Sequence, residues 1–373
     1  MLIQSVIDHL NATFHPQYQE SYDNSGFLVG NPMQEARGVL VALDLTPDVI
    51  EEAVQTGCNL ICTHHPFMFG GVKRITPATQ EGRMIMMLLE NHICHYAAHT
   101  NMDNMLHGVS GILADKLGVE NYRVLRPMEG VLRKLVVYVP TSHAQQVREA
   151  LFAAGAGRCV AGTMEEKDVT YSHCSASAKV EGTFMPHEGS HPFLGETGKV
   201  NSVVEERIEV VYERHIERKL INKMLEIHPY EEPAYDLYSV RNANSQIGGG
   251  VIGTLPEAMP TVDFLKRVKD VIGIPCIRTS ALCKETVKRV AMCGGSGNFM
   301  IGDAKTQGAD IYLTGDLKYH DFQMAEGEIV LAEIGHYESE QFARELLLRA
   351  LNEKFPQLES RLSKRNYGYA QYL

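Results

Sequence analysis

The stretch GVLVALD at residues 38–44, followed by LTPDVIEEAVQT at 45–56 and GCNLICTHHP at 57–66, decides the fold. The first segment is an apolar run of strand length, and Thr46-Pro47 supplies a capping hydroxyl and a proline for the first turn of a helix that runs to about Thr56. A second apolar run at Leu60–Thr63 predicts another strand. This order of strand, helix and strand predicts a parallel sheet covered by helices.

The same alternation continues through the first third of the chain and returns in the last third. After residue 63 we expect a helix at 83–91, a strand at 95–98 and a helix at 108–117. Near the other end we expect strands at 287–292, 311–314 and 329–333, a helix at 299–307 and a long helix at 339–355. The predicted fold class is therefore α/β, with a two-part host domain built on parallel-type sheets.

The middle of the chain has a different pattern. We expect strands near 132–139, 170–179, 207–211 and 234–240, and helices near 142–153 and 216–227. The order β-α-β-β-α-β is ferredoxin-like. Its boundaries fall near 127–130 and in the polar, glycine-rich stretch 242–250. The predicted domains are 1–129, the first half of the host; 130–240, an α+β insert; and 241–373, the second half of the host.

Composition limits the function. The chain has 373 residues, a formal net charge of −11, 44% hydrophobic and 22% charged residues, which is typical of a soluble globular protein. No apolar run is long enough to span a membrane, and residues 1–17 lack the basic start of a signal peptide. The eight cysteines form no CxxC pair, so we expect a reducing cytoplasm. The acidic balance disfavours nonspecific binding of nucleic acid.

Four polar clusters follow predicted strands of the host. Open α/β sheets bind ligands at the carboxyl ends of their strands, so we expect folding to bring these clusters together. The clusters are Thr63-His64-His65-Pro66, His99-Thr100-Asn101-Met102-Asp103, Thr314-Gly315-Asp316-Leu317-Lys318-Tyr319-His320 and Gly335-His336-Tyr337-Glu338-Ser339-Glu340.

Imidazole and carboxylate groups in these clusters suit divalent transition metals. His64 and His65 are adjacent, so in an extended segment they point in opposite directions and suit two neighbouring ions better than one. His336 and Glu340 share a helix face, and Asp103 adds a second carboxylate. Such ligands accept zinc, iron or manganese, and the lack of a cysteine cluster argues against a structural thiolate site.

Each cluster also has an interpretation without a metal. Taken alone, the His64-His65 pair is an ordinary loop feature, and an isolated HxxxE spacing is weaker still. His99 and His320 can be ligands, proton carriers or hydrogen-bond partners of ligands, and we favour the last role for both. The turn at Cys293–Asn298 can present N–H groups to an anion or merely make a tight crossover between strand and helix.

Several of these segments together resemble the NGG-interacting-factor-three-like family, whose members are often named GTP cyclohydrolase I type 2 homologues. The matching segments are Asp23–Gly30, Asp44–Pro47, Thr63–Pro66, His99–Asp103, Cys293–Gly297, Thr314–Asp316 and Gly335–Glu340. The family pattern usually begins its first segment with Trp, where this chain has Tyr22.

The resemblance implies a two-metal site. Carried over position by position, the family's ligands fall on the set already favoured by residue type and spacing: His64, His65, Asp103, His336 and Glu340. The resemblance also implies that the insert is similar to PII-like and CutA-like trimeric folds and that the protein forms a toroidal homohexamer.

The leading functional hypothesis is a metal-dependent hydrolase of unknown substrate, with two divalent ions per subunit, zinc or iron before manganese. Its candidate proton carriers are His99, His320 and Glu338. The alternative is a noncatalytic protein that binds or inserts metal, or senses a small molecule through the insert. A third hypothesis, nucleic-acid binding in the cavity of the ring, is opposed by the acidic charge.

Overall fold

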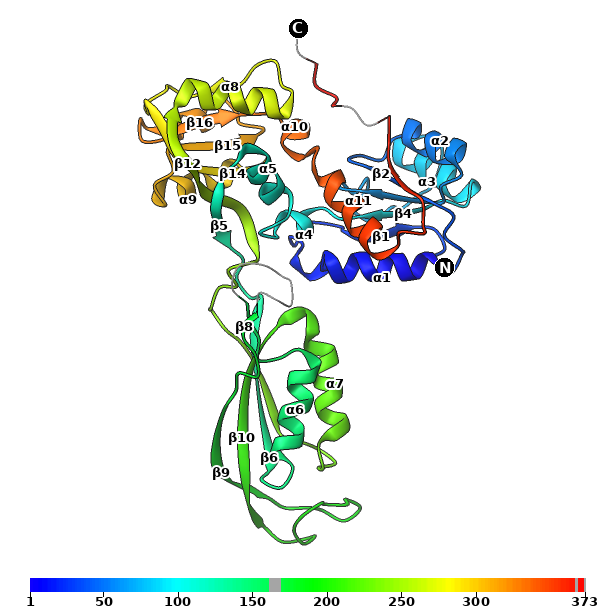
Figure 1. The fold of residues 1–373 in the computed structure, drawn as a ribbon. Coiled ribbons are helices and arrows are strands. Elements are labelled where there is room, and N and C mark those ends of the chain that lie inside the picture. Colours follow the sequence, from blue (N-terminus) through cyan, green and yellow to red (C-terminus); the bar gives the residue numbers. More distant parts are fainter. Residues whose placement is uncertain (161–168, 366–367, 372–373) are drawn as a thin grey trace. The chain divides into compact units, whose positions relative to one another are not determined.

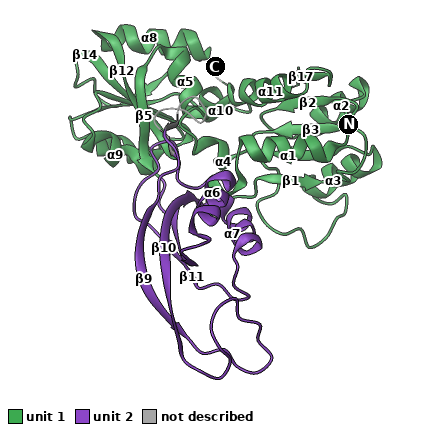
Figure 2. Cartoon of the chain, turned by 60° about the horizontal axis from the view of Figure 1, so that its bottom comes forward, with its two compact units in different colours: residues 1–127, 247–373 green, residues 128–246 purple. Residues whose placement is uncertain are grey.

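The computed structural model describes residues 1–160, 169–365 and 368–371, and its contacts separate two units (Figure 2). Unit 1 comprises Met1–Pro127 and Ile247–Leu373, and unit 2 comprises Met128–Gln246. The chain is a mixed α/β protein with several sheets (Figure 1).

A five-stranded sheet forms the first half of unit 1. Its strand order is β1-β4-β3-β2-β17, in which β1 is antiparallel and the other four strands are parallel. The strands are β1 (Gly26–Val29), β2 (Val39–Ala42), β3 (Leu60–Thr63), β4 (Cys94–Ala97) and β17 (Ser360–Leu362). Helices cover both faces: α1 (Ile3–Thr13) and α11 (Ala343–Lys354) on one, α2 (Pro47–Thr56) and α3 (Gln80–Glu90) on the other.

Strand β2 shows why this sheet is apolar throughout. Val39 and Val41 pack into the core beneath α1 and α11, whereas Leu40 and Ala42 pack into the core beneath α2 and α3. Alternate residues of a strand point to opposite faces, so a strand covered on both sides needs a continuous apolar run. The sequence 38–44 has that run.

A six-stranded mixed sheet forms the second half of unit 1, with the order β13-β16-β15-β14-β12-β5. The three strands predicted from the sequence, β14, β15 and β16, run parallel, whereas β5, β12 and β13 are antiparallel to their neighbours, so the sheet is mixed and only in part of the expected parallel type. The strands are β5 (Glu120–Pro127), β12 (Gly248–Pro260), β13 (Arg278–Thr279), β14 (Thr286–Ser296), β15 (Ile311–Gly315) and β16 (Val330–Glu333). Helices α5 (Val109–Leu117) and α8 (Thr261–Ile272) pack on one face, and α9 (Ile301–Thr306) with the 3-10 turns η4 (Asn298–Met300) and η5 (Asp321–Ala325) on the other.

The long helix expected at 339–355 is two helices. Helix α10 (His336–Glu340) ends before Gln341, and α11 begins at Ala343. The side chain of Phe342, at the junction, packs against the cores of both sheets. The break therefore lets one segment serve two cores, with α10 beside the second sheet and α11 on the first.

Unit 2 is a four-stranded antiparallel sheet of order β11-β6-β10-β9, with two helices on one face. Its main elements are β6 (Leu132–Pro140), α6 (Ala144–Ala154), β9 (Ala176–Phe184), β10 (Asn201–Glu213), α7 (Glu217–Ile227) and β11 (Tyr235–Ser239). A small pair, β7 (Cys159–Val160) and β8 (Val169–Tyr171), and the turn η3 (Arg214–Ile216) complete it. The strand expected at 170–179 is thus divided between β8 and β9.

Two short elements of unit 1 remain, η1 (Pro16–Tyr18) and α4 (Thr100–Asp103). Among the described residues, none of the helices combines the length and apolar character that crossing a bilayer requires.

Candidate metal centre

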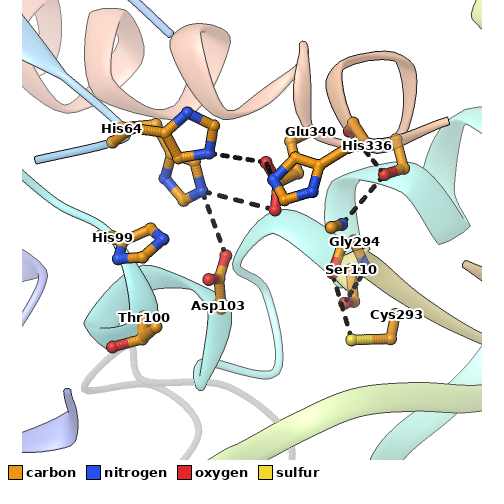
Figure 3. Close-up of polar contacts among 12 residues, drawn as sticks. His64, His99, Thr100, Asp103, Ser110, Cys293, Gly294, His336 and Glu340 are labelled. Atoms are coloured by element: carbon orange, nitrogen blue, oxygen red, sulfur yellow. Dashed lines mark hydrogen bonds and ion pairs between the residues drawn. The ribbon is translucent and has the colours of Figure 1, made fainter. Parts of the chain in front are cut away.

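Side chains that follow strands of both sheets in unit 1 meet at this site, so the predicted clusters come from two sheets and not from one sheet edge. His64 and His65 follow β3 and Asp103 ends α4 after β4, whereas His336 and Glu340 lie on α10 after β16. Figure 3 shows His64 and His336 beside the carboxylate of Glu340, with Asp103 next to His64. His65 also contacts this carboxylate. The convergence predicted from the strand ends is therefore present, although the geometry of one sheet edge is not.

Glu340 occupies the middle of the cluster. Its Oε2 lies 2.8 Å from His65 Nε2 and 3.0 Å from His336 Nε2, and its Oε1 lies 3.9 Å from His64 Nε2. His64 Nε2 is also 3.4 Å from Asp103 Oδ1. Three imidazoles and a second carboxylate thus surround one almost fully buried carboxylate.

The glycine-rich end of β14 makes room for Glu340. Gly295 has φ +63°, and a Cβ at this position would lie 2.1 Å from Glu340 Oε1. The N–H of Gly295 donates to Ser339 Oγ, and the N–H of Gly294 donates to Ser110 Oγ. Both donors are engaged, which favours the tight crossover over the anion site for this segment.

The outer nitrogen of each histidine is held by an acceptor. Nδ1 of His65 donates to Asp44 at 2.7 Å, and Nδ1 of His336 donates to Asp316 at 2.7 Å. His64 Nδ1 donates to the carbonyl of Ala98 at 2.7 Å. A hydrogen bond at Nδ1 fixes the ring and directs the Nε2 lone pair inwards, which is the arrangement of metal-binding histidines.

Asp44 and Asp316 were not among the predicted site residues. Each follows a parallel strand, β2 or β15, and each lies in a segment quoted for the family resemblance. Their position after a strand was a usable signal, but their contact with histidine Nδ1 atoms depends on tertiary geometry.

The pKa values of the three histidines in the cluster depart from the ordinary histidine value in different directions. Burial alone would lower the pKa of His65, but hydrogen bonds to Asp44 and Glu340 outweigh it and raise the pKa to about 10. A hydrogen bond to Glu340 raises the pKa of His336 to about 9, whereas burial lowers the pKa of His64.

The two carboxyl groups respond in opposite ways. Burial opposes ionisation of Glu340, but hydrogen bonds, first from His336, hold its pKa well below the usual range. Burial and the nearby charge of Glu340 raise the pKa of Asp103 well above its usual range. A divalent cation would take the place of the protons on these groups, so its binding would release protons.

Two polar atoms at the centre face each other at 3.4 Å without forming a hydrogen bond. His64 Nε2 and Asp103 Oδ1 are buried and make no hydrogen bond within the described part of the chain. Unsatisfied buried polar atoms are rare and need an explanation, of which an absent ion is one. The donor set of imidazole nitrogens and carboxylate oxygens fits a divalent transition metal.

Known protein families include one that matches nearly the whole chain. A model of the family Duf34/NIF3 (NGG1p interacting factor 3) matches residues 1–366. The chain belongs to this family. It is 40% identical over 299 residues to a protein of Halalkalibacterium halodurans named GTP cyclohydrolase 1 type 2 homolog. The matched region covers 80% of this chain and 78% of the relative.

Further relatives agree. A protein of Bacillus subtilis with the same name is 38% identical over 343 residues, covering 91% of this chain and 89% of the relative. The crystal structure of a Bacillus cereus protein related to NIF3 superposes with a TM-score of 0.81 at 34% identity and covers 100% of this chain and 99% of that chain. The fold described above is therefore similar to that of solved NIF3-related proteins over its full length.

Three groups of side chains in this Duf34/NIF3 protein can each hold a metal ion, since one ligand atom from each member lies within 4.8 Å of the others. The groups are His65, His336 and Glu340; His64, Asp103 and Glu340; and His64, His65 and His99. All five predicted ligand residues are present in these groups, and Glu340 belongs to two of them.

The three candidate proton carriers are placed differently. His99 faces the cluster, with its ring centroid 5.3 Å from that of His64, and its Nδ1 donates to Asp23 at 2.8 Å. His99 therefore resembles His64, His65 and His336, because its Nδ1 is held by an acceptor. His320 and Glu338 do not line the cleft beside the cluster. His320 lies on an exposed turn before η5.

The cluster opens into a cleft of about 450 Å³. Three largely exposed aromatic side chains, Tyr22, Phe69 and Phe299, line it together with the metal-site residues. No lysine or arginine is among its lining residues in the described chain. The cleft therefore combines an acidic, histidine-rich floor with aromatic walls.

Proposed function

We propose that the cluster binds two divalent metal ions per subunit, zinc or iron before manganese, and that the protein is a metal-dependent hydrolase. The observation that carries the proposal is the position of Glu340 between two ligand groups, one with His65 and His336 and the other with His64 and Asp103. A carboxylate has two oxygens and could serve two ions, and the adjacent His64 and His65 belong to different ones of these two groups.

Divalent ions, when bound, supply Lewis acidity that polarises a substrate oxygen and makes water nucleophilic at neutral pH. The protein's own residues orient the site around them. Asp44 and Asp316 hold the rings of His65 and His336 in one orientation, and Gly295 allows Glu340 to approach the strand end.

His99 is the proton carrier that the geometry favours. Its Nδ1 is engaged by Asp23, so its Nε2 is the nitrogen free to accept or donate a proton in the cleft. An imidazole positioned by a carboxylate is well suited to general acid–base catalysis.

The walls of the cleft indicate what kind of substrate suits it. Aromatic rings at positions 22, 69 and 299 favour a planar, unsaturated molecule. Phosphate groups are usually recognised by arginine or lysine, and none lines the cleft in the described chain. The cyclohydrolase name belongs to the relatives, and this lining does not favour GTP over uncharged ring compounds.

The alternative is a noncatalytic protein that binds or inserts metal, or that senses a small molecule through unit 2. The strand order β11-β6-β10-β9 and the separate core of unit 2 support a ferredoxin-like, PII-like or CutA-like insert at about 130–240. A fold alone does not fix an activity, so the insert can serve as a ligand-binding domain even if the protein has no hydrolase activity.

The proposal includes an oligomeric state and a cellular location. We expect a toroidal homohexamer from the family resemblance, and light scattering of the purified protein tests it. The scattered cysteines, which form no CxxC pair in the sequence, support a reducing cytoplasm as the location. Binding of nucleic acid is not expected.

A hydrolysis screen tests the catalytic part. Protein with confirmed metal occupancy is incubated with nucleotides, phosphoesters, amides and cyclic amidines. A His99→Asn variant with the same metal content is assayed beside it to test the role of His99. We expect turnover that falls at least tenfold in the variant. Fully loaded protein that turns over none of these compounds would support the noncatalytic alternative.

A further inference from the structure

Unit 2 has a cleft of its own, of about 710 Å³. It lies on the face of the sheet opposite the two helices and is closed by residues of the loop that follows β9 and of the segment that follows α7. All its lining residues belong to unit 2, so it is independent of the proposed metal centre.

A buried carboxylate lies in this cleft. Glu205 on β10 is only 7% exposed. Ile208 and Val210, three and five positions further along β10, face the helix-side core. Side chains an odd number of positions apart point to opposite faces of a strand, so Glu205 points away from the helices. Gly182 on β9 leaves room for it, because a Cβ there would lie 2.3 Å from Glu205 Oε2.

Glu205 has no basic partner. In the described chain, no lysine, arginine or histidine forms an ion pair with it. The Tyr230 phenol lies close to Glu205, since burial and then hydrogen bonding with the Glu205 carboxylate raise the pKa of Tyr230, but this contact is not a close, well-oriented hydrogen bond. A buried carboxylate is costly unless a cation or strong donor pairs with it.

Aromatic rings form the walls around this carboxylate. Tyr138, Phe184, Phe193 and Tyr230 line the cleft, and the centroids of the Phe193 and Tyr230 rings are 6.4 Å apart. Phe193 is 46% exposed, although it belongs to an apolar wall. The faces of aromatic rings attract cations, and their apolar surface is available for burial.

The remaining charges in the cleft are also negative. Glu231 and Glu232 line it, and no lysine or arginine does so among the described residues. His187 lines it as well, and His191 pairs with Glu231 at 3.5 Å. Anionic ligands are therefore disfavoured by the whole lining, not by Glu205 alone.

We propose that this cleft binds a small organic cation, an amine or guanidinium group carried on an apolar body. The cationic group pairs with the Glu205 carboxylate, and the apolar body covers Phe193 and Tyr230. The cleft is then a ligand site within unit 2. Binding there does not depend on whether the metal centre is catalytic.

Calorimetric titration of the full-length protein tests the proposal with three probes: agmatine, 2-phenylethylamine and, as an anion of similar size, glutarate. We expect saturable binding of at least one of the two cations and none of glutarate. Glu205→Gln keeps the shape and removes the charge, so it should weaken cation binding at least tenfold. Glu232→Gln removes a carboxylate that is exposed at the same cleft and should change affinity by no more than about threefold.

Phe193→Leu provides an independent variant if Glu205→Gln does not fold, which circular dichroism decides. It should weaken 2-phenylethylamine severalfold without changing the fold, because Phe193 lies largely at the surface. Failure of both cations to bind, or equal binding to the native and Glu205→Gln proteins, overturns the proposal. Loss of the native oligomeric state in Phe193→Leu would also overturn it, since the cleft would then be a contact between copies of the chain.

Discussion

His65 Nε2 and Glu340 Oε2 lie 2.8 Å apart, although 275 positions separate the two residues in the sequence. His65 follows a strand of the first sheet and Glu340 lies on the helix after a strand of the second sheet. The contact therefore joins the two halves of unit 1 at the candidate metal centre. Changes that move either residue should affect metal binding and the stability of unit 1 together.

Gly295→Ala tests how closely Glu340 is positioned. The new methyl group would collide with Glu340 Oε1 and would need a left-handed backbone that alanine disfavours. We expect a loss of about 1–3 kcal/mol in the free energy of unfolding and a lower metal content. Urea denaturation and elemental analysis measure the two effects.

Gly302→Ala is the matched control for that substitution. Gly302 lies in α9, and a Cβ there meets no atom within 4 Å. Alanine should leave metal content unchanged and alter stability by less than about 1 kcal/mol, in the stabilising direction. Equal effects of the two substitutions would show that Gly295 has no special relation to Glu340.

Asp44→Asn tests whether the acceptors behind the histidines tune the site. The amide pairs less strongly with His65 Nδ1 and removes a charge that raises the pKa of His65. We expect affinity for zinc to fall about 10–100-fold, although no proposed ligand is changed. Competition titration with a chelator measures the affinity, and Asp263→Asn, on the surface of α8, should leave it unchanged.

Asp23 is expected to make the protein sensitive to acid. Burial opposes its ionisation, but hydrogen bonds from His99, Thr100 and Ser25 hold its pKa well below the usual range. The folded state therefore binds this proton less readily than the unfolded state, so the stabilisation is present above the ordinary aspartate pKa of about 4 and is lost as the pH falls below it.

Asp23→Asn should remove that dependence. At neutral pH the variant should lose about 1–3 kcal/mol of unfolding free energy, and the difference from the native protein should shrink as the pH falls from about 5 towards 3. Urea denaturation across this range measures it. A difference that stays constant with pH would show that the Asp23 carboxylate is not the group responsible.

Removal of unit 2 separates the metal centre from the insert. Pro127 and Gly248 are partners in the β5–β12 pairing, so Asn-Gly can replace Met128–Gln246 and close a short hairpin. Both sheets of unit 1 and their four cores lie outside the deletion. We expect a folded protein with the native metal content; a folded protein without metal would contradict the independence of the centre.

The sequence was most informative where a residue follows a buried strand. The predicted strands that form β3, β4 and β16 are each followed by a polar cluster, and these three clusters include every residue of the two ligand groups that share Glu340. Periodicity and strand length are local properties, so local sequence is sufficient to reveal them.

Other features depend on contacts between distant segments. The antiparallel strands β5 and β12 have no local signal for their direction, and the break between α10 and α11 arises because Phe342 packs into two cores. Asp44 and Asp316 gain a role only when a histidine Nδ1 lies beside them. His320 resembles a site residue in the sequence, but it is exposed and does not line the cleft.

Metal content per chain is the most direct test of the account. The native protein, purified without chelators, is compared by elemental analysis with Glu340→Gln, Asp103→Asn and the surface control Glu353→Gln. We predict about two ions per chain in the native and Glu353→Gln proteins and a clear loss in the other two, since each removes a charged ligand. Negligible metal in the folded native protein, even after supplementation with zinc, iron and manganese, would contradict the proposed metal centre.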